Sequence, residues 1–107
     1  MGRAGLGEFE HKVLLAILRL GSESYSVPIV LELEGRTGKS VAPAAVYIAL
    51  RRLENKGLVR SRMGRGEDSD RTRRFFKVED AGVERLQESR RALEALWDGL
   101  DPVLNKR

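Results

Sequence analysis

Hydrophobic residues three and four positions apart predict two helices in the first third of the chain. In residues 7–20 (GEFEHKVLLAILRL) they form one face of a helix, and Gly21 ends the pattern. A shorter helix is expected to begin at Ser26, which suits an N-cap because its hydroxyl can accept a backbone hydrogen bond. This second helix is expected to end at Gly35 or Gly38, since glycine readily adopts the conformation that follows a last turn.

A third helix is expected between Pro43 and Gly57, where apolar and polar positions separate into two faces. The buried stripe has the spacing i, i+3, i+4, i+7 and consists of Val46, Ala49, Leu50 and Leu53. The opposite face has small residues near its start and two arginines near its end. This face comprises Ala44, Ile48, Arg51, Arg52 and Asn55, with Tyr47 on its flank. Such a face is suited to lying in the groove of a second molecule.

After Gly57 the pattern changes from a helical period to a period of two. Residues 58–63 (LVRSRM) and 73–78 (RRFFKV) read as two basic strands, and a polar loop that contains glycine separates them. The two segments therefore predict a β-hairpin. Because Phe75 and Phe76 are neighbours in one strand, one is expected to face the core and the other to point outward.

A helical pattern resumes at residue 79 and continues to residue 104. Its apolar residues occupy the a and d positions of heptads, and a single a position holds a charged residue. The full set is Val83, Leu86, Arg90, Leu93, Trp97, Leu100 and Leu104. One long helix with this seam has more apolar surface than the preceding domain covers, so we predict that the seam is a dimer interface. The alternative for Trp97 is the wall of a pocket for a flat hydrophobic effector.

The order of elements is therefore helix, helix, helix, hairpin and long helix. It predicts a mainly α-helical fold with a small β-hairpin, namely a winged helix-turn-helix domain over residues 7–78. Residues 79–104 are expected to form a C-terminal dimerisation helix within the same compact unit. In this fold the third helix enters the major groove of double-stranded DNA, whose width of roughly 12 Å admits an α-helix.

The distribution of charge agrees with a nucleic-acid partner. The chain of 107 residues has 20 basic and 16 acidic side chains, and residues 51–77 hold ten of the basic and four of the acidic ones. Residues 1–50 are neutral as a whole and residues 78–107 are net acidic. The positive field therefore comes from the third helix and the hairpin. We predict a DNA-binding surface that consists of Ala44, Tyr47, Ile48, Arg51, Arg52, Arg71, Arg73 and Arg74.

Other interpretations of these residues stay open. Arginines on a helix face are often simply solvated, and Tyr47 can pack on the flank of its helix instead of reaching a phosphate. The chain would then be a winged-helix adaptor that binds a protein partner through its C-terminal helix. Salt-dependent binding to duplex DNA separates the two functions, because the adaptor does not require it.

Composition argues against an enzyme, a metal protein and a membrane protein. The chain has no cysteine and a single histidine, His11, which is expected to be exposed on the first helix. We therefore predict no catalytic residue, no cofactor and no metal site, and we interpret Glu67, Asp68 and Asp70 as a solvated loop. The longest apolar run has six residues, whereas a membrane-spanning helix needs roughly 20. A cytoplasmic protein is expected.

Three segments resemble the PadR-like family of transcriptional regulators. Residues 41–59 (VAPAAVYIALRRLENKGLV) are similar to the recognition helix of that family, and residues 7–38 are similar to its first two helices. Residues 71–82 (RTRRFFKVEDAG) are similar to its wing strand and the start of its last helix. The resemblance covers nearly the whole chain. It implies a homodimeric repressor whose C-terminal helices dimerise and whose two winged domains bind a palindromic operator.

The resemblance also implies roles for single residues. Tyr47 matches the helix-3 tyrosine that lies near the DNA backbone in this family. Arg51 and Arg52 match the polar outer face of its recognition helix, and Arg73 and Arg74 match its basic wing strand.

The sequence departs from the family pattern at two pairs of residues. Ala44 and Ala45 stand where glycine followed by threonine or serine is frequent, so a hydroxyl that could hold a phosphate or a base is missing. Phe75 and Phe76 stand where tyrosines are common. Effectors in the shorter-tailed branch of the family range from aromatic compounds to none known, and a small aromatic effector is the corresponding expectation here.

Overall fold

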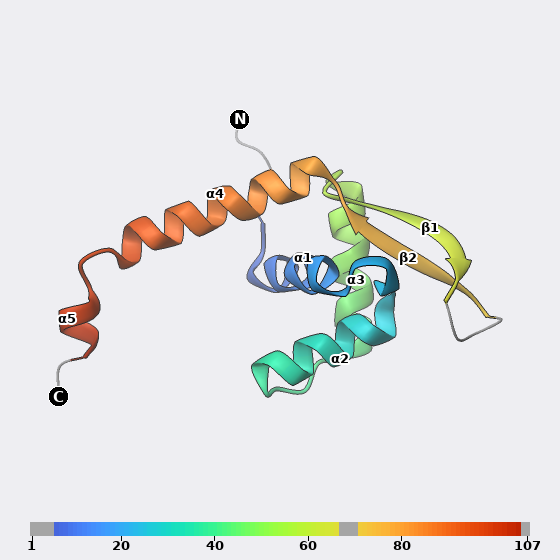
Figure 1. Ribbon diagram of the computed structural model, residues 1–107, viewed down its shortest axis with the longest axis horizontal. Helices are drawn as coiled ribbons and strands as arrows, with labels where there is room; N and C mark the ends of the chain where they lie inside the picture. Colours follow the sequence, from blue (N-terminus) through green and yellow to red (C-terminus); the bar gives the residue numbers. More distant parts are fainter. Residues whose placement is uncertain (1–5, 67–70, 106–107) are drawn as a thin grey trace.

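Three helices form a core from which a β-hairpin and a C-terminal arm extend (Figure 1). The computed structural model describes residues 6–66 and 71–105. The first elements are α1 (Glu8–Leu20), the short 3-10 helix η1 (Gly21–Glu23), α2 (Ser26–Thr37) and α3 (Pro43–Asn55). The hairpin consists of β1 (Val59–Arg65) and β2 (Thr72–Val78), and the arm consists of α4 (Asp80–Trp97) and α5 (Asp101–Leu104). This order confirms the predicted winged helix-turn-helix architecture.

The first two helices end at glycines that the sequence analysis had named, and the N-cap of α2 lies one residue earlier than predicted. α1 ends at Gly21, whose φ of +61° lies in the region that favours glycine. Of the two glycines considered for the end of α2, Gly38 ends the helix in a left-handed conformation and Gly35 lies inside it. The N-cap of α2 is Tyr25 and not Ser26, and no side chain caps the helix there.

The core lies where the inner faces of α1, α2 and α3 meet the base of the hairpin. α3 buries the predicted stripe almost completely. The other helices add Val13, Leu14, Ala16 and Ile17 from α1, and Ile29 and Leu33 from α2. Packing between residues far apart in the chain therefore fixes the direction of α3, whose opposite face stays exposed.

Both phenylalanines of β2 are buried, which corrects the expectation that one of them points outward. Phe76 faces the core. Phe75 is on the other face of the hairpin, where the ring of Tyr25 covers it at 5.5 Å between centroids and 74° between ring planes. The segment before α2 reaches the strand because the Phe76 N–H donates a hydrogen bond to the Ser24 carbonyl (2.8 Å). This segment lies along the edge of the hairpin and covers its outer face.

The arm is not the single helix that was expected for residues 79–104. α4 ends at Trp97, and Gly99 adopts a φ of +81° in the turn that follows. Pro102 lies in the first turn of α5, where its missing N–H costs no hydrogen bond. The glycine and the proline together therefore replace a continuous helix by two helices.

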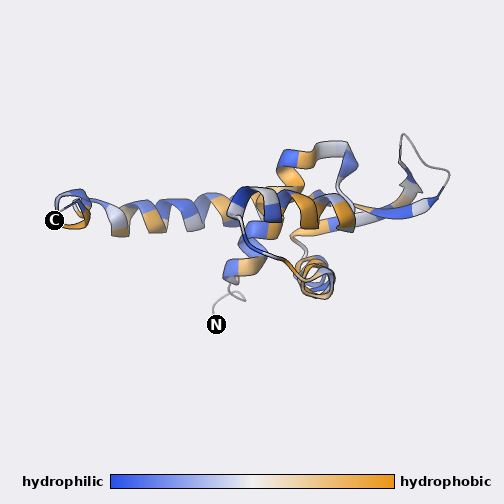
Figure 2. Cartoon of the chain, turned by 90° about the horizontal axis from the view of Figure 1, so that it is seen from below, coloured by the Kyte–Doolittle hydropathy of each residue, from blue (hydrophilic) through white to orange (hydrophobic). Residues whose placement is uncertain are grey.

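The exposed seam of the arm is also shorter than predicted. Leu86 is buried in the core of its own chain and Val83 is half-buried, so neither presents much surface to a second molecule. Every described residue from Arg90 onward is exposed. Figure 2 shows the arm extending from the core with hydrophobic and hydrophilic residues interspersed along it. Within the described ranges, none of the helices has the length and hydrophobicity that crossing a membrane requires.

His11 is half-buried, in contrast to the exposed position expected for it. Its Nδ1 lies 3.2 Å from the hydroxyl of Ser89, which belongs to α4. The contact joins the first helix to the arm and gives the single histidine a structural position.

Gly82 lies where α4 passes very close to the hairpin, and we expect Gly82→Ala to destabilise the protein. A Cβ at this position would collide with the Leu58 carbonyl oxygen and would lie 2.7 Å from the Val78 Cγ1. The carbonyl cannot move freely, because it accepts a hydrogen bond from the Glu79 N–H (2.9 Å). Overpacking of this kind costs about 1–3 kcal/mol in the free energy of unfolding, which chemical denaturation measures.

Gly35→Ala is the matched control for this substitution. Gly35 is also helical and a Cβ there would meet no atom within 4 Å. The same change should therefore stabilise α2 by about 0.5–1 kcal/mol. Equal stabilities of the two variants would show that α4 can move away from the hairpin at little cost.

A buried ion pair joins the start of α1 to the end of α3. The Lys56 ammonium donates to the Glu10 carboxylate at 2.6 Å, and the Gly7 N–H donates to the same oxygen at 3.0 Å. Burial raises the pKa of Glu10, but the hydrogen bonds from Lys56 and Gly7 and the charges of Lys56 and Arg52 outweigh burial. The pKa of Glu10 therefore lies below its ordinary value of 4.5.

The lowered pKa of Glu10 predicts a loss of stability in acid. The ion pair contributes fully above pH 4.5, the value of the unfolded chain, and its contribution disappears as the pH falls through the lower pKa of the folded chain. Thermal unfolding between pH 6 and pH 3 measures this dependence. Glu10→Gln should lower the unfolding temperature at pH 6 and make it fall less steeply between pH 6 and pH 3. Glu8→Gln, at an exposed position of the same turn, should leave this pH dependence unchanged.

Candidate nucleic-acid interface

The outer face of α3 is exposed and combines apolar with basic side chains. Ala44 and Ile48 occupy its first two turns, and Arg51 follows on the next turn. Ile48 leaves 49% of its surface exposed. The Arg51 Nη1 donates to the Tyr47 hydroxyl (3.2 Å), and its guanidinium carbon lies 5.9 Å from the centre of the Tyr47 ring. Tyr47 therefore holds the arginine in place on the exposed face.

Two exposed residues of α2 extend this apolar surface, and the sequence analysis missed them. Val27 and Leu31 are each more than half exposed. They line a shallow depression together with Ala44 and Tyr47 of α3. Their spacing of i, i+4 was visible in the sequence, but α2 has a second apolar stripe with the same spacing, and only packing decides which stripe is buried.

Arg52 lies on the opposite flank of α3 from Tyr47. It lines a second depression with Phe9 of α1 and Ile48. Its side chain is exposed, and its charge acts on the buried carboxylate of Glu10. The two neighbouring arginines of α3 therefore face different surroundings, and Arg51 is the one on the outer face.

Arg74 lies on the face of the hairpin that is turned toward α3. Its Nη1 donates to the Ser61 hydroxyl (2.9 Å), and that hydroxyl donates to the Glu54 carboxylate of α3 (2.6 Å). Met63 and Arg65 share this face, because antiparallel pairing places Met63 opposite Arg74. Arg65 and Arg74 are both exposed. This inner face continues the basic surface of α3.

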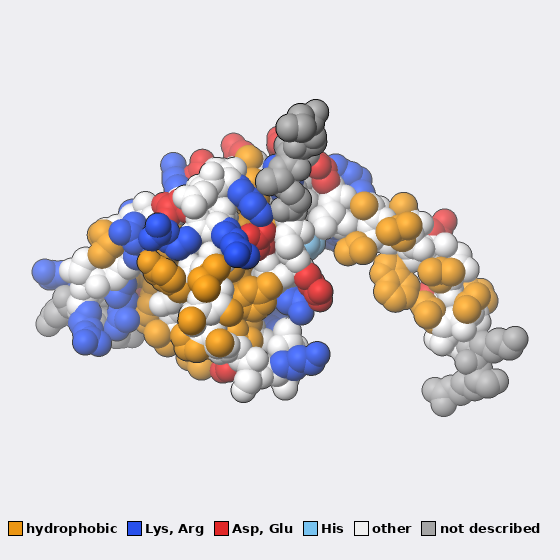
Figure 3. All heavy atoms as spheres, turned by 180° about the vertical axis from the view of Figure 1, so that it is seen from behind, with side chains coloured by type: hydrophobic (Ala, Val, Ile, Leu, Met, Phe, Trp, Pro, Cys, Tyr) orange, Lys and Arg blue, Asp and Glu red, His pale blue; other side chains and the backbone are white. Residues whose placement is uncertain are grey.

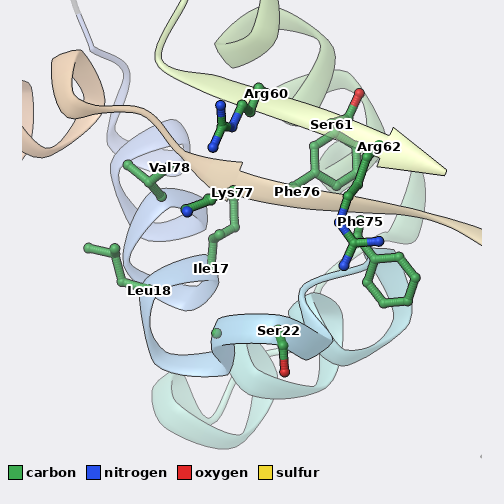
Figure 4. Close-up of a pocket in the computed structure, with 11 residues that line it drawn as sticks. Ile17, Leu18, Ser22, Arg60, Ser61, Arg62, Phe75, Phe76, Lys77 and Val78 are labelled. Carbon is green, nitrogen blue, oxygen red and sulfur yellow. The ribbon is translucent and has the colours of Figure 1, made fainter. Parts of the chain in front are cut away.

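The other face of the hairpin holds Arg60, Arg62, Arg73 and Lys77. Figure 4 shows Arg60, Arg62 and Lys77 projecting from the strands toward α1 and η1. Arg73 is half-buried with its guanidinium carbon 4.5 Å from the centre of the Tyr25 ring. The two arginines predicted for the wing strand, Arg73 and Arg74, thus lie on opposite faces.

The remaining predicted site residues lie near the hairpin loop. Arg71 is exposed next to the start of β2. The acidic residues Glu67, Asp68 and Asp70 lie outside the described residues. In the described part of the chain, no three histidine or acidic side chains come together as a metal site would need.

The exposed part of the arm bears four of the predicted apolar interface residues, namely Leu93, Trp97, Leu100 and Leu104. Leu96 and Val103, which the heptad pattern did not include, are more exposed still. Arg90 forms an ion pair with Glu94 of its own helix (3.0 Å). Figure 3 shows hydrophobic side chains gathered along the arm, while basic side chains are spread over the helical core and hairpin.

A family model described as "Transcriptional regulator PadR-like family" matches residues 14–88. This range extends from the middle of α1 through α3 and the hairpin into α4. A comparison with curated proteins gave no match.

Several solved structures are similar over most of the chain. A PadR-like transcriptional regulator from Bacillus cereus strain ATCC 14579 has a TM-score of 0.77 at 18% identity, over 92% of this chain and 93% of that one. A PadR family transcription regulator from Clostridium difficile R20291 has a TM-score of 0.74 at 18% identity, over 91% of this chain and 99% of that one. A PadR family transcriptional regulator from Eggerthella lenta DSM 2243 has a TM-score of 0.68 at 26% identity, over 89% of this chain and 82% of that one.

The structural similarities establish the fold. The family model in addition identifies the family to which the sequence belongs. It matches well over half of the sequence and includes the whole of α3 and the hairpin. The chain therefore belongs to the PadR-like family of transcriptional regulators.

Proposed function

We propose that the protein is a homodimer that binds a palindromic DNA operator and represses transcription. The observation that supports this function best is the exposed outer face of α3, with Arg51 held by Tyr47 and the basic inner face of the hairpin beside it. Membership of a family of transcriptional regulators supports it as well. A regulator of this kind needs no catalytic residue and no cofactor.

The outer face of α3 would lie in the major groove, where the first turns of a recognition helix meet base edges. Ala44 and Ile48 present only aliphatic groups on these turns. The group on a base edge that suits an aliphatic surface is the methyl group of thymine, whereas an arginine pairs best with guanine. We therefore expect each half-site to contain thymine beneath Ile48 and guanine beneath Arg51.

The hairpin would act as the wing that contacts phosphates beside the groove. Arg65 and Arg74 extend from the face turned toward α3, and Arg71 lies at the same end of the hairpin as Arg65. Contacts to phosphates position a protein on DNA without reading its sequence. Arg73 would act indirectly, because its stacking on Tyr25 holds the loop end of the hairpin against the segment before α2.

A second copy of the chain would cover the apolar arm. Leu93, Trp97 and Leu100 are exposed on one stretch of it, beyond the part that packs on its own core. Two recognition helices placed by such a dimer would read half-sites about 34 Å apart, one turn of DNA. In such a dimer Trp97 would lie at the interface between the two arms, where its ring could form one wall of a pocket for a flat aromatic effector.

Selection of bound sequences from a random duplex pool tests this function. The full chain should enrich an inverted repeat, and a footprint on that sequence should show two-fold symmetry. Affinity should fall steeply with salt concentration. A footprint without symmetry would contradict the palindromic dimer, and an absence of salt-dependent binding would favour an adaptor that binds protein.

Removing thymine methyl groups tests the reading by Ile48. Replacing the relevant thymine by deoxyuridine in the selected operator should weaken binding by about 0.8 kcal/mol for each buried methyl group. Fluorescence anisotropy measures the affinities. The Ile48→Ala protein should bind both operators alike, so that deoxyuridine adds no further loss of affinity to that of the substitution. Full sensitivity to deoxyuridine in the Ile48→Ala protein would place the methyl group under another residue.

A further inference from the structure

The charges on the exposed part of the arm are divided between its two ends. Two neighbouring arginines, Arg90 and Arg91, lie where the arm leaves the core, and both are exposed. Farther along the described arm the charged side chains are Glu94, Asp98 and Asp101, which are all acidic and all exposed. The exposed arm is therefore basic near the core and acidic toward its end.

The apolar seam of the arm has the same spacing in both directions from Ala95. Leu93 precedes Ala95 by two positions, and Trp97 follows it by two. Arg90 precedes Ala95 by five positions, and Leu100 follows it by five. If two arms lie antiparallel and cross at Ala95, each Leu93 comes opposite Trp97 of the partner subunit, and each Arg90 comes opposite the turn between the partner's α4 and α5. Two parallel arms would instead place every seam residue opposite its own copy.

Arg90 distinguishes the two directions, because it is the charged residue of the seam. In parallel arms two Arg90 side chains would face each other between apolar layers, and like charges would meet without a partner. In antiparallel arms the opposing turn carries Asp98 and Asp101. Arg90 uses its Nε for Glu94 of its own helix (3.0 Å), and the terminal nitrogens of a guanidinium can bind a second carboxylate. The antiparallel arrangement therefore brings opposite charges together.

We propose that the arms of two copies pair antiparallel about Ala95, so that Arg90 of each copy binds the carboxylates of Asp98 and Asp101 of the partner subunit. This pairing rests on the proposed homodimer, and it adds the direction of the arms and a basis for choosing a partner. Apolar contacts alone leave the direction open, whereas a charge within a seam fixes it at some cost in stability. An arm with another order of charges would not match at both ends, so the contact favours a second copy of this chain.

Distances between spin labels test the direction of the arms. The chain has no cysteine, so one introduced cysteine gives one labelled pair per dimer. Ala81 and Ala95 are both exposed on α4 and lie two heptads apart on the same side of the helix. Antiparallel arms that cross at Ala95 would hold the Ala95→Cys labels level and separate the Ala81→Cys labels by about 42 Å along the axis. Parallel arms would give the same separation at both positions, and double electron–electron resonance measures both.

Removal of Arg90 tests the ion pair itself. Arg90→Ala should weaken the dimer about tenfold, because the contact occurs twice and each exposed ion pair contributes modestly. Sedimentation at a series of concentrations measures the dissociation constant. Arg91→Ala is the matched control, since Arg91 is an exposed arginine outside the seam, and its loss should leave the dissociation constant unchanged. In parallel arms Arg90→Ala would strengthen the dimer instead, because it would remove a repulsion.

An exchange of charges shows whether the acidic turn is the partner of Arg90. Arg90→Glu and the double variant Asp98→Lys, Asp101→Lys should each dimerise poorly alone, since each brings like charges together at both ends of the seam. An equimolar mixture should form a heterodimer, in which opposite charges meet again. A mixture that stays monomeric, equal label distances, or a tighter dimer of Arg90→Ala would each overturn the antiparallel pairing alone. A wild-type chain that sediments as a monomer would overturn the proposed homodimer and this pairing with it.

Discussion

Arg51→Ala is expected to lower the affinity for the operator by about 2–6 kcal/mol per dimer, because a dimer presents the side chain twice and each base contact contributes about 1–3 kcal/mol. Binding to random duplex should change little. Arg51 lies on the outer face of α3, and the Tyr47 hydroxyl accepts its hydrogen bond at 3.2 Å. An arginine held in this way loses less conformational freedom on binding, so its donors are already placed for a guanine edge.

Two variants separate base reading from general attraction to DNA. Arg36→Ala removes the same charge from α2, where Arg36 pairs with Glu32 at 2.8 Å, and it should leave operator binding nearly unchanged. Arg74→Ala should weaken binding to operator and random duplex alike and reduce the salt slope, as loss of a phosphate contact does. Anisotropy titrations at several salt concentrations measure all three proteins. Equal losses on both DNAs for Arg51→Ala would make Arg51 a phosphate contact.

Much of the fold was predictable because short-range signals determine it. The spacing of apolar residues in α3 reveals its buried stripe without any knowledge of its neighbours. Gly21 and Gly38 adopt positive φ where the helices end, so the sequence marks those ends directly. The hairpin and its approximate strands follow from the change of period after Gly57.

The burial of Phe75 was not predictable from the pattern of its strand. Tyr25, which covers it, lies 50 positions earlier in the chain, and no periodicity links two such distant segments. The end of α4 at Trp97 is a different case, since Gly99 and Pro102 were visible in the sequence. The heptad spacing of apolar residues continues past Gly99 and Pro102 to Leu104, and it therefore led to the prediction of one continuous helix.

The structure exposes the predicted face of α3, whereas on the hairpin it divides the predicted arginines between two faces. The face that Ala44, Ile48 and Arg51 occupy follows from helical geometry alone. In contrast, alternation along the strand places Arg73 and Arg74 on opposite faces but does not say which face is turned toward α3. Tertiary contacts, such as the one between Ser61 and Glu54, determine that. Sequence reasoning therefore predicted a basic hairpin but could not assign each of its arginines to one face or the other.

Leu93→Glu is expected to convert the proposed dimer into a monomer. Leu93 is 49% exposed and packs little on its own chain, so the helical core should keep its circular dichroism spectrum and most of its stability. In the dimer the variant would place a carboxylate of each copy in an apolar seam, and burying an unpaired charge costs several kcal/mol. Operator affinity should fall about 10²- to 10⁴-fold, because the two half-sites are no longer bound by linked domains.

Sedimentation at micromolar concentration measures the change of mass, and Gln87→Glu is its control. Gln87 is exposed on the same helix but outside the heptad seam, so it adds the same charge without entering the proposed interface. If Leu93→Glu still sediments as a dimer, the partner uses another side of the arm. Leu96 and Val103, which are 72% and 67% exposed, are the most exposed large apolar residues of the described arm. Leu96→Glu would then produce the monomer in its place, since an arm without a partner would leave both apolar sides in water.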